Sequence, residues 1–312
     1  MDAAVARYGG RREAWLDLST GMNPSPTAFP PVPTDAWTRL PERWNELELE
    51  RAARSAYRVP DWLDVLSVPG TQAALQLLPS IVPPRCDIAI VGPTYSEHER
   101  CWSLGGYSVR HVDEPATADV LVVVNPNNPD GRDRDPEGLI GRARHLTVVD
   151  EAFRDTAAER SALQHCDERT VILRSLGKFH GLAGVRLGHV IGTRSLLSPL
   201  RERLGPWAVS GPALHVGRAA LSADRNAIAI ELRERAERLV ALLRRRGVTI
   251  VGATDYFALT CWKDGCAAYE ALARDRILVR RFSYRNDWLR FGLPDDEGFE
   301  RLDEALLKFV EA

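Results

Sequence analysis

Short apolar segments alternate with helix-like segments along residues 65–203, and this alternation constrains the fold more than any other feature. The apolar segments are 65–68, 88–91, 108–112, 120–124, 147–149, 171–173 and 189–191. Helical patterns fall at 71–80, 95–104, 136–143 and 196–203. Strands that are apolar throughout are buried on both faces, and this alternation is typical of βαβ units. We therefore predict an α/β domain with a mainly parallel sheet flanked by helices.

The pattern changes after residue 212. A long helical segment covers 213–246, with a break near 223–224 and Gly247 as its cap. Strand-like runs at 249–251, 257–260, 277–279 and 289–291 and helical runs at 267–274 and 296–309 follow, which predicts a smaller α+β domain. We divide the chain into an N-terminal arm that packs with the small domain (1–42), a large domain (43–211), and an interdomain helix with the small domain (212–312).

The composition excludes several classes of protein. The chain has 312 residues and a net charge of −2, whereas a nucleic-acid binder normally has a strong basic excess. No apolar run approaches the about 20 residues that cross a bilayer, and the first residues lack an apolar signal core. Five cysteines without a Cys-x-x-Cys pair favour a reducing cytoplasm. We expect no metal site, and we interpret His98 and Cys101 as neighbours on one helix.

One lysine occupies an unusual position. Only three lysines occur among 41 basic residues, and Lys178 follows the predicted strand 171–173 in a glycine-rich segment. Ser175 and Arg186 flank it, and both side chains suit a phosphate group. Apolar neighbours would lower the pKa of the lysine and leave the nucleophilic amine that Schiff-base chemistry requires. From this segment alone, a surface lysine in a loop is equally consistent.

Further polar residues follow the other predicted strands. A carboxylate, Asp150, ends the strand 147–149 and needs a partner, for which a pyridinium nitrogen is suitable. An amide turn with Asn128 follows the strand 120–124, and Tyr95 follows 88–91. The strand-to-helix turn at Gly70, Thr71 and Gln72 offers backbone N–H groups to an anion. Together these residues fit pyridoxal 5′-phosphate (PLP).

In their order along the chain, these motifs resemble those of a known family. They are similar to motifs of the fold-type I PLP enzymes of the aspartate-aminotransferase superfamily. The motifs are Gly-Thr-Gln, Pro-Thr-Tyr, Asn-Pro-Asn-Asn-Pro-x-Gly, Asp-Glu-Ala and Ser-x-x-Lys with a later Arg. The resemblance spans nearly the whole chain. Several segments, among them Leu-Ser-Thr-Gly-Met-Asn-Pro at 18–24, resemble the threonine-phosphate decarboxylase branch of the aerobic cobalamin pathway. The histidinol-phosphate aminotransferases are the alternative branch.

The resemblance implies a role for each cofactor-site residue. Lys178 would form the Schiff base, Asp150 would pair with the pyridine nitrogen, and Asn128 would bind the ring hydroxyl. Tyr95 would stack on the ring. The phosphate would be held by Gly70, Thr71, Gln72, Ser175 and Arg186, and by Tyr57 reaching across a homodimer interface. Phe153 departs from the pattern, because many aminotransferases have a tyrosine there that bonds the ring hydroxyl.

The resemblance also implies a substrate site and a reaction. Arg290 would clamp the substrate carboxylate, and Gly21 and Asn23 would approach the substrate. Arg280 would contact a substrate phosphate, although the adjacent Arg281 could take that role. The expected reaction is decarboxylation of L-threonine O-3-phosphate, with a histidinol-phosphate-type transamination as the alternative.

Two other classes of function are less consistent with the sequence. A non-catalytic protein on this scaffold would be expected to lose the Schiff-base lysine, and Lys178 is present. The arginine-rich helical segment 231–246 could suggest nucleic-acid binding. Its first arginines alternate with glutamates at helical pair spacing, which is typical of a solvated helix face.

Overall fold

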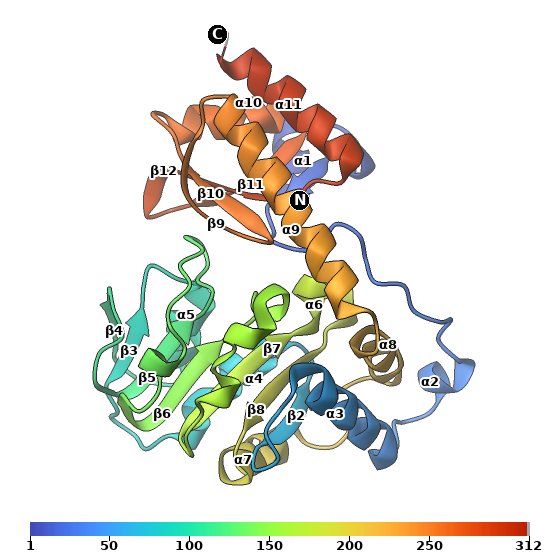
Figure 1. Cartoon of the computed structure of the whole chain (residues 1–312), viewed down its shortest axis with the longest axis vertical. Coiled ribbons are helices and arrows are strands. Elements are labelled where there is room, and N and C mark those ends of the chain that lie inside the picture. Colours follow the sequence, from blue (N-terminus) through green and yellow to red (C-terminus); the bar gives the residue numbers. More distant parts are fainter. Residues whose placement is uncertain (311–312) are drawn as a thin grey trace. The chain divides into compact units, whose positions relative to one another are not determined.

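The chain divides into two compact units in a computed structural model that describes residues 1–310 (Figure 1). Unit 1 consists of Met1–Ser25, Pro129–Arg132 and the chain from Asn226 onward. Unit 2 consists of Pro26–Asn128 and Asp133–Arg225. Residues 26–42 and 212–225, which the sequence-based division grouped with the arm and the small domain, therefore group with unit 2.

Unit 2 is built on a seven-stranded sheet in the order β2-β8-β7-β6-β5-β3-β4. Its strands are β2 (Asp64–Val68), β3 (Ile88–Val91), β4 (Val109–Val112), β5 (Ala118–Val124), β6 (Ala143–Asp150), β7 (Thr170–Ser175) and β8 (Gly188–Gly192). All neighbours are parallel except β8, which runs antiparallel to both β2 and β7. This confirms the predicted α/β fold with a mainly parallel sheet.

Helices cover both faces of this sheet, which explains why its central strands are apolar on both faces. On one face Leu121 and Val123 pack in a cluster with α3 (Arg43–Tyr57) and α8 (Gly211–Leu221). On the other face Val120 and Val122 pack in a cluster with α4, α5 and α7. These helices are α4 (Thr71–Leu77), α5 (Ser96–Leu104) and α7 (Arg194–Leu204). Successive side chains of a strand point to opposite faces, so both sets need an apolar partner.

The predicted helix at 136–143 is wrong. The structure has only a 3₁₀ turn, η3 (Glu137–Leu139), and β6 begins at Ala143. Gly141 adopts a left-handed φ of 78°, which ends any helical path before the strand. The remaining short elements of unit 2 are α2 (Thr34–Thr38), η2 (Leu78–Ile81), η4 (Asp155–Arg160), η5 (Ala162–Gln164), α6 (Leu176–Phe179) and η6 (Ala183–Val185).

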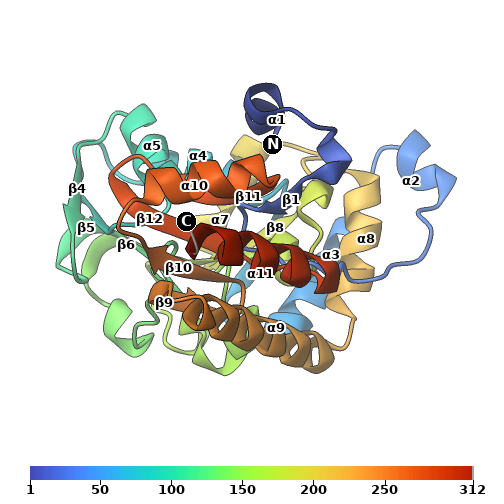
Figure 2. The ribbon, with the colours of Figure 1, turned by 90° about the horizontal axis from the view of Figure 1, so that it is seen from above.

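Unit 1 is built on a five-stranded sheet in the order β1-β11-β12-β10-β9. The strands are β1 (Leu16–Leu18), β9 (Thr249–Thr254), β10 (Phe257–Cys261), β11 (Ile277–Phe282) and β12 (Arg285–Gly292). The helices are α1 (Asp2–Tyr8), α9 (Arg225–Arg245), α10 (Gly265–Arg274) and α11 (Asp296–Val310), with a short η1 (Arg12–Ala14). Helices α10 and α11 run across one face of the sheet (Figure 2). The predicted α+β content of this part of the chain is confirmed.

A four-residue segment, Pro129–Arg132, belongs to unit 1 although both of its neighbours in the chain belong to unit 2. It lies directly on β9, because a Cβ atom added to Gly252 would fall 1.8 Å from the carbonyl oxygen of Asp130. A Cβ atom on Gly131 would likewise fall 2.5 Å from the carbonyl oxygen of Ala253. Two glycines therefore permit this close backbone contact. Among residues 1–310 no helix is long and apolar enough to cross a bilayer.

Candidate active site

The register of the unit 2 sheet gathers the predicted cofactor residues at one edge. Val124 pairs with Asp150, and Asp150 pairs with Leu173, so three parallel strands end side by side. Gly188, at the start of β8, pairs with both Ser175 and Val68. The edge therefore carries Gly70, Thr71, Gln72, Tyr95, Asn128, Asp150, Ser175, Lys178 and Arg186. Ligands bind where loops converge at the carboxyl ends of such strands.

The turn between β2 and α4 lies against the guanidinium of Arg186. Gly70 has a φ of 79°, and a Cβ atom at this position would fall 2.8 Å from Nη2 of Arg186. Arg186 itself has a left-handed φ of 55°, and its Nη1 donates to the carbonyl oxygen of Ala183 at 3.2 Å. A Cβ atom on Gly188 would fall 2.9 Å from the backbone nitrogen of Thr71. A bare backbone turn beside a guanidinium, with hydroxyls at Thr71 and Ser175, fits a phosphate group.

The carboxylate of Asp150 is buried and held by two donors. Nε2 of His98 lies 3.0 Å from Oδ2 of Asp150, and the backbone N–H of Ala152 donates to Oδ1 at 3.0 Å. The acceptor is a carboxylate, so the proton of a neutral His98 ring must sit on Nε2. Both side chains are almost fully buried. These bonds fix the orientation of an anionic group that suits a protonated ring nitrogen.

The sequence reasoning missed His98, which it interpreted only as a helix neighbour of Cys101. The available signal was its spacing from Tyr95. The two residues are three apart at the start of α5, and their rings contact each other edge to face with centroids 6.1 Å apart. Tyr95 is 38% exposed. The hydrogen bond between Nε2 of His98 and Oδ2 of Asp150 therefore adds His98 to the residues that orient the carboxylate.

The lysine-bearing segment is compact. Lys178 lies in α6, and its Nζ is 5.8 Å from the ring centroid of Phe153. Phe153 is buried and lies three residues after Asp150 in the chain. A Cβ atom on Gly177 would fall 2.9 Å from Cα of Ala183, so this turn requires a glycine. The structure thus presents an amine next to an apolar ring, as a Schiff-base site needs.

Two turns at the edge are tied together by an amide. The hydroxyl of Thr94 donates to Oδ1 of Asn127 at 2.7 Å, and Nδ2 of Asn127 donates to the carbonyl oxygen of Pro93 at 3.0 Å. Asn127 therefore links the turn that carries Tyr95 to the turn that carries Asn128.

Tyr57 has a different environment from the rest of the predicted set. It is 5% exposed, and its ring lies under the guanidinium groups of Arg174 and Arg225 at 4.5 and 5.5 Å. Burial raises the pKa of its hydroxyl well above the usual range. Tyr57 is therefore buried against two guanidinium groups of its own chain, and its contact with the phosphate of a partner stays a prediction.

A buried ion network lies beneath the edge. Arg174 donates to Glu151 at 2.9 Å and to Asp155 at 2.7 Å, and Arg225 donates to Asp155 at 2.5 Å. Burial acts to raise the pKa of Asp155, but the two guanidinium groups outweigh it and lower the pKa to about 2. Glu151 follows Asp150 and Arg174 precedes Ser175, so the ion pairs join the end of β7 to the turn after β6.

The predicted substrate residues lie in unit 1. Arg280 of β11 and Arg290 of β12 are register partners, so their side chains share one face of the sheet. Arg281 points the other way, because its guanidinium lies 4.5 Å from the ring centroid of Tyr269 in α10. This geometry favours Arg280 over Arg281 as the companion of Arg290. Burial and the charge of Arg280 lower the pKa of Arg290 to about 10, which leaves it cationic at neutral pH.

The segment after β1 lies next to Arg290. Nη2 of Arg290 donates to the carbonyl oxygen of Ser19 at 2.9 Å. Gly21 and Asn23 follow within four residues, and both are buried. The side chain of Asn23 accepts a hydrogen bond from the backbone of Ser25 at 2.8 Å, which forms a local turn. Unit 1 thus holds the four predicted substrate residues Gly21, Asn23, Arg280 and Arg290.

The sequence and the fold of the chain are similar to those of known aminotransferases and decarboxylases. Residues 62–306 match the family described as aminotransferase class I and II. The chain is 44% identical to a threonine-phosphate decarboxylase from Sinorhizobium sp, covering 98% of this chain and 95% of that protein. It is 41% identical to a threonine-phosphate decarboxylase from Pseudomonas aeruginosa, covering 99% and 96%. Its fold resembles that of histidinol-phosphate aminotransferase from Sinorhizobium meliloti in complex with pyridoxal-5′-phosphate, with a TM-score of 0.81 at 17% identity over 99% and 94% of the two chains.

Proposed function

Because the chain belongs to the class I and II aminotransferase family, we propose that it is a PLP enzyme that decarboxylates L-threonine O-3-phosphate. The product would be (R)-1-amino-2-propanol O-2-phosphate, which is used in cobalamin biosynthesis. The observation that carries the proposal is the similarity, over nearly the whole chain, to two threonine-phosphate decarboxylases. The arrangement at the sheet edge of unit 2 supports the cofactor assignment.

We propose that different residues at the sheet edge bind different parts of the cofactor. Arg186, Ser175 and the turn at Gly70–Gln72 would hold its phosphate, and Asp150 would hold the ring-nitrogen proton. Lys178 would supply the amine that attaches the cofactor. When bound, PLP supplies an electron sink for the bond that breaks at the substrate Cα. Asp150 is oriented by His98 and Ala152, so it needs no rearrangement to meet a cation.

The remaining steps depend on how the substrate is held. We assign its carboxylate to Arg290 and its phosphate to Arg280, because the two guanidinium groups share one face of the unit 1 sheet. Their mutual repulsion is relieved by an anionic ligand, and threonine phosphate carries two anionic groups. After carbon dioxide leaves, Nζ of Lys178 would return a proton to Cα as a general acid.

We further propose that the enzyme acts in the cytoplasm as a homodimer. All five cysteines are free in the described structure, as a reducing compartment requires.

The test is a product assay with threonine phosphate and with histidinol phosphate, each with and without 2-oxoglutarate. We expect carbon dioxide from threonine phosphate without a keto-acid acceptor. A strict requirement for 2-oxoglutarate would instead indicate an aminotransferase. Lys178→Ala should abolish both turnover and the visible absorbance of the lysine-linked cofactor, and Lys263→Ala serves as the matched control.

A further inference from the structure

The hairpin that joins β11 to β12 in unit 1 carries three aromatic side chains that contact one another. It turns through two residues, Ser283 and Tyr284. The ring centroid of Tyr284 lies 5.6 Å from that of Phe282 and 6.5 Å from that of Trp288. The rings of Phe282 and Trp288 also meet edge to face, with centroids 6.4 Å apart. Two ring contacts therefore hold Tyr284 in place, although the residue is 50% exposed.

The aromatic cluster lies on the same face of the unit 1 sheet as the two proposed substrate arginines. Trp288 precedes Arg290 by two residues, and both pair in regular register with β10, so their side chains point to the same side. Arg280 is the register partner of Arg290 and shares that side. Because Tyr284 packs against Trp288, its ring also belongs to the face that carries the two guanidinium groups.

The charges around the hydroxyl of Tyr284 suit a hydrogen-bond donor to an anion. Partial burial, followed by the charge of Asp130, raises the pKa of this hydroxyl above its ordinary value. The group therefore keeps its proton at neutral pH and can donate. Arg280 and Arg290 act on the pKa in the opposite direction, and the effect of Arg280 is the larger of the two. The hydroxyl thus lies in the field of both arginines, and more strongly in that of Arg280.

Arg280 differs from the other arginine near this hydroxyl, Arg285. Arg285 donates two hydrogen bonds to Asp287, at 2.9 and 2.8 Å, so a carboxylate already compensates its charge. Arg280 is exposed, and within residues 1–310 no carboxylate forms an ion pair with it. Its guanidinium is therefore available to an anionic ligand.

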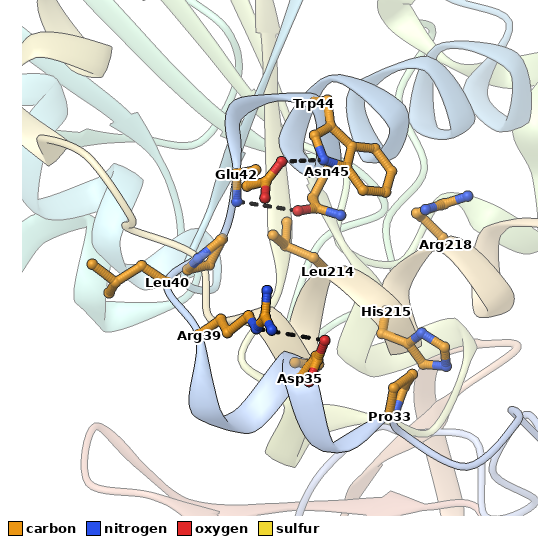
Figure 3. A pocket seen from close by; sticks show the side chains of 13 residues that line it. Pro33, Asp35, Arg39, Leu40, Glu42, Trp44, Asn45, Leu214, His215 and Arg218 are labelled. Carbon is orange, nitrogen blue, oxygen red and sulfur yellow. Dashed lines mark hydrogen bonds and ion pairs between the residues drawn. The ribbon is translucent and has the colours of Figure 1, made fainter.

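A hollow in unit 2 shows the opposite arrangement. It has a volume of about 310 Å³ and lies between α2, α3 and α8 (Figure 3). Two of its lining residues are Arg39 and Arg218. Arg39 pairs with Asp35 at 3.5 Å, and Arg218 pairs with Glu48 at 3.9 Å. Because carboxylates already accompany these cations, the face of Arg280 is the better place for an anion.

The shape of a phosphate group leaves a role for a second donor beside Arg280. A phosphate monoester has three terminal oxygens that accept hydrogen bonds. The fork of one guanidinium meets at most two of them, so the third oxygen needs another donor. Tyr284 follows Arg280 by four residues, in the turn directly after β11. A carboxylate has only two oxygens, and the fork of Arg290 can meet both.

We propose that Tyr284 is a substrate-binding residue whose hydroxyl donates a hydrogen bond to the phosphate group held by Arg280. The inference rests on the proposed function, which supplies a phosphorylated substrate. A site built to hydrogen-bond a group discriminates strongly against the analogue that lacks it. Tyr284 therefore helps the enzyme to select phosphorylated over unphosphorylated ligands.

The test compares two ligands of the PLP-loaded full chain. They are the proposed product, (R)-1-amino-2-propanol O-2-phosphate, and the same amine without its phosphate. Titrations followed by the visible absorbance of the cofactor give both dissociation constants without turnover. Tyr284→Phe removes the hydroxyl and keeps the ring contacts. We expect it to raise the dissociation constant of the phosphorylated amine at least about fivefold and that of the unphosphorylated amine less than about twofold.

Tyr269→Phe is the matched control. Tyr269 also lies beside an arginine, because the guanidinium of Arg281 is 4.5 Å from its ring centroid, but Arg281 points away from the face of Arg280. Both dissociation constants of this control should equal those of wild type. Thermal melting of the two variants checks that each is folded.

A smaller rise for the phosphorylated amine in Tyr284→Phe would overturn the proposal, and so would an equal weakening of both amines. Wild-type enzyme that binds the two amines equally would overturn it as well. Failure of the proposed function has a different sign, namely that wild type releases no carbon dioxide from threonine phosphate. The ratio of the two dissociation constants needs no turnover, so it still reports on Tyr284 in that case.

Discussion

At the scale of the residue, the phosphate turn depends on the absence of a side chain at position 70. Gly70→Ala would place a methyl group in contact with Nη2 of Arg186 at a φ of 79°. The arginine fork can swing away, so we expect only about 1 kcal/mol of destabilisation from backbone strain. The displaced guanidinium should raise the dissociation constant of PLP at least tenfold.

Equilibrium binding of PLP to the variant measures this effect. Gly184→Ala is the control from the same segment as Arg186, because a Cβ atom there meets no atom within 4 Å. Equal PLP affinity in Gly70→Ala and Gly184→Ala would contradict the assigned phosphate site.

Two buried histidines make stability sensitive to acid. Burial lowers the pKa of His189 to about 3 and that of His180 to about 4, against about 6.5 in the unfolded chain. As the pH falls below about 6.5, the unfolded chain binds protons that the folded chain excludes. The free energy of unfolding should therefore decrease on acidification.

His189→Phe tests this effect while keeping an aromatic contact with Tyr57. The variant loses the hydrogen bond between His189 and Ser67. It also lacks the imidazole that would take up a proton in the unfolded chain at low pH. Between pH 7.5 and 5 its free energy of unfolding should fall by about 2 kcal/mol less than that of wild type. Urea denaturation at both pH values measures the difference, with the exposed His165→Phe as control. Parallel pH profiles of wild type and His189→Phe would refute the assignment.

Single residues were predictable where the chemistry requires one residue type. Lys178 follows β7 and Asp150 ends β6, and the combination of an amine, a buried carboxylate and a phosphate turn at one sheet edge indicated a cofactor that no single residue indicated alone. His98 was not predictable in the same way, because its role depends on a 3.0 Å contact between residues 52 positions apart. The burial of Tyr57 likewise comes from three residues that are distant in the chain, Arg174, His189 and Arg225.

At the scale of the element, β6 and β7 are joined by backbone hydrogen bonds along the sheet and by buried ion pairs at their ends. Arg174→Met would leave Glu151 buried with fewer donors and Asp155 with Arg225 alone. Removing one partner of a buried ion pair costs about 3–5 kcal/mol, and we expect that loss in urea denaturation of the PLP-loaded enzyme. Arg194→Met is the control, because that side chain is 85% exposed and its pair with Asp64 should contribute at most about 1 kcal/mol. A similar loss of unfolding free energy in Arg174→Met and Arg194→Met would show that the buried network does not stabilise the ends of β6 and β7.

The elements themselves were largely predictable because the central strands of unit 2, such as β3, β5 and β7, contain continuous apolar runs between turn residues. The helix predicted at 136–143 was wrong because the composition of this segment allows a helix. Gly138 and Gly141 interrupt it, and pairing with β5 makes its end part of the strand β6. β1 was missed because Leu16–Leu18 has only three residues and becomes a strand through pairing with β11, some 260 positions away. Pairing across such a distance leaves no local pattern.

At the scale of the whole molecule, the chain passes repeatedly from one unit to the other. Unit 1 is assembled from three separate segments. A fragment of residues 226–312 would lack β1 and the segment that covers β9. We therefore expect it to give no cooperative unfolding transition by circular dichroism, whereas the full chain does. Cooperative unfolding of the fragment alone would show that unit 1 needs neither of the other two segments.

The four residues Pro129–Arg132 also limit how genes of this kind can recombine. A crossover near codon 225 would exchange the C-terminal part of unit 1 between related enzymes but leave 129–132 behind. The new β9 would then meet a foreign segment at two glycine positions that tolerate no Cβ atom. Changes on either side of that contact must be inherited together, so viable chimaeras should retain matching parental sequence at both sites.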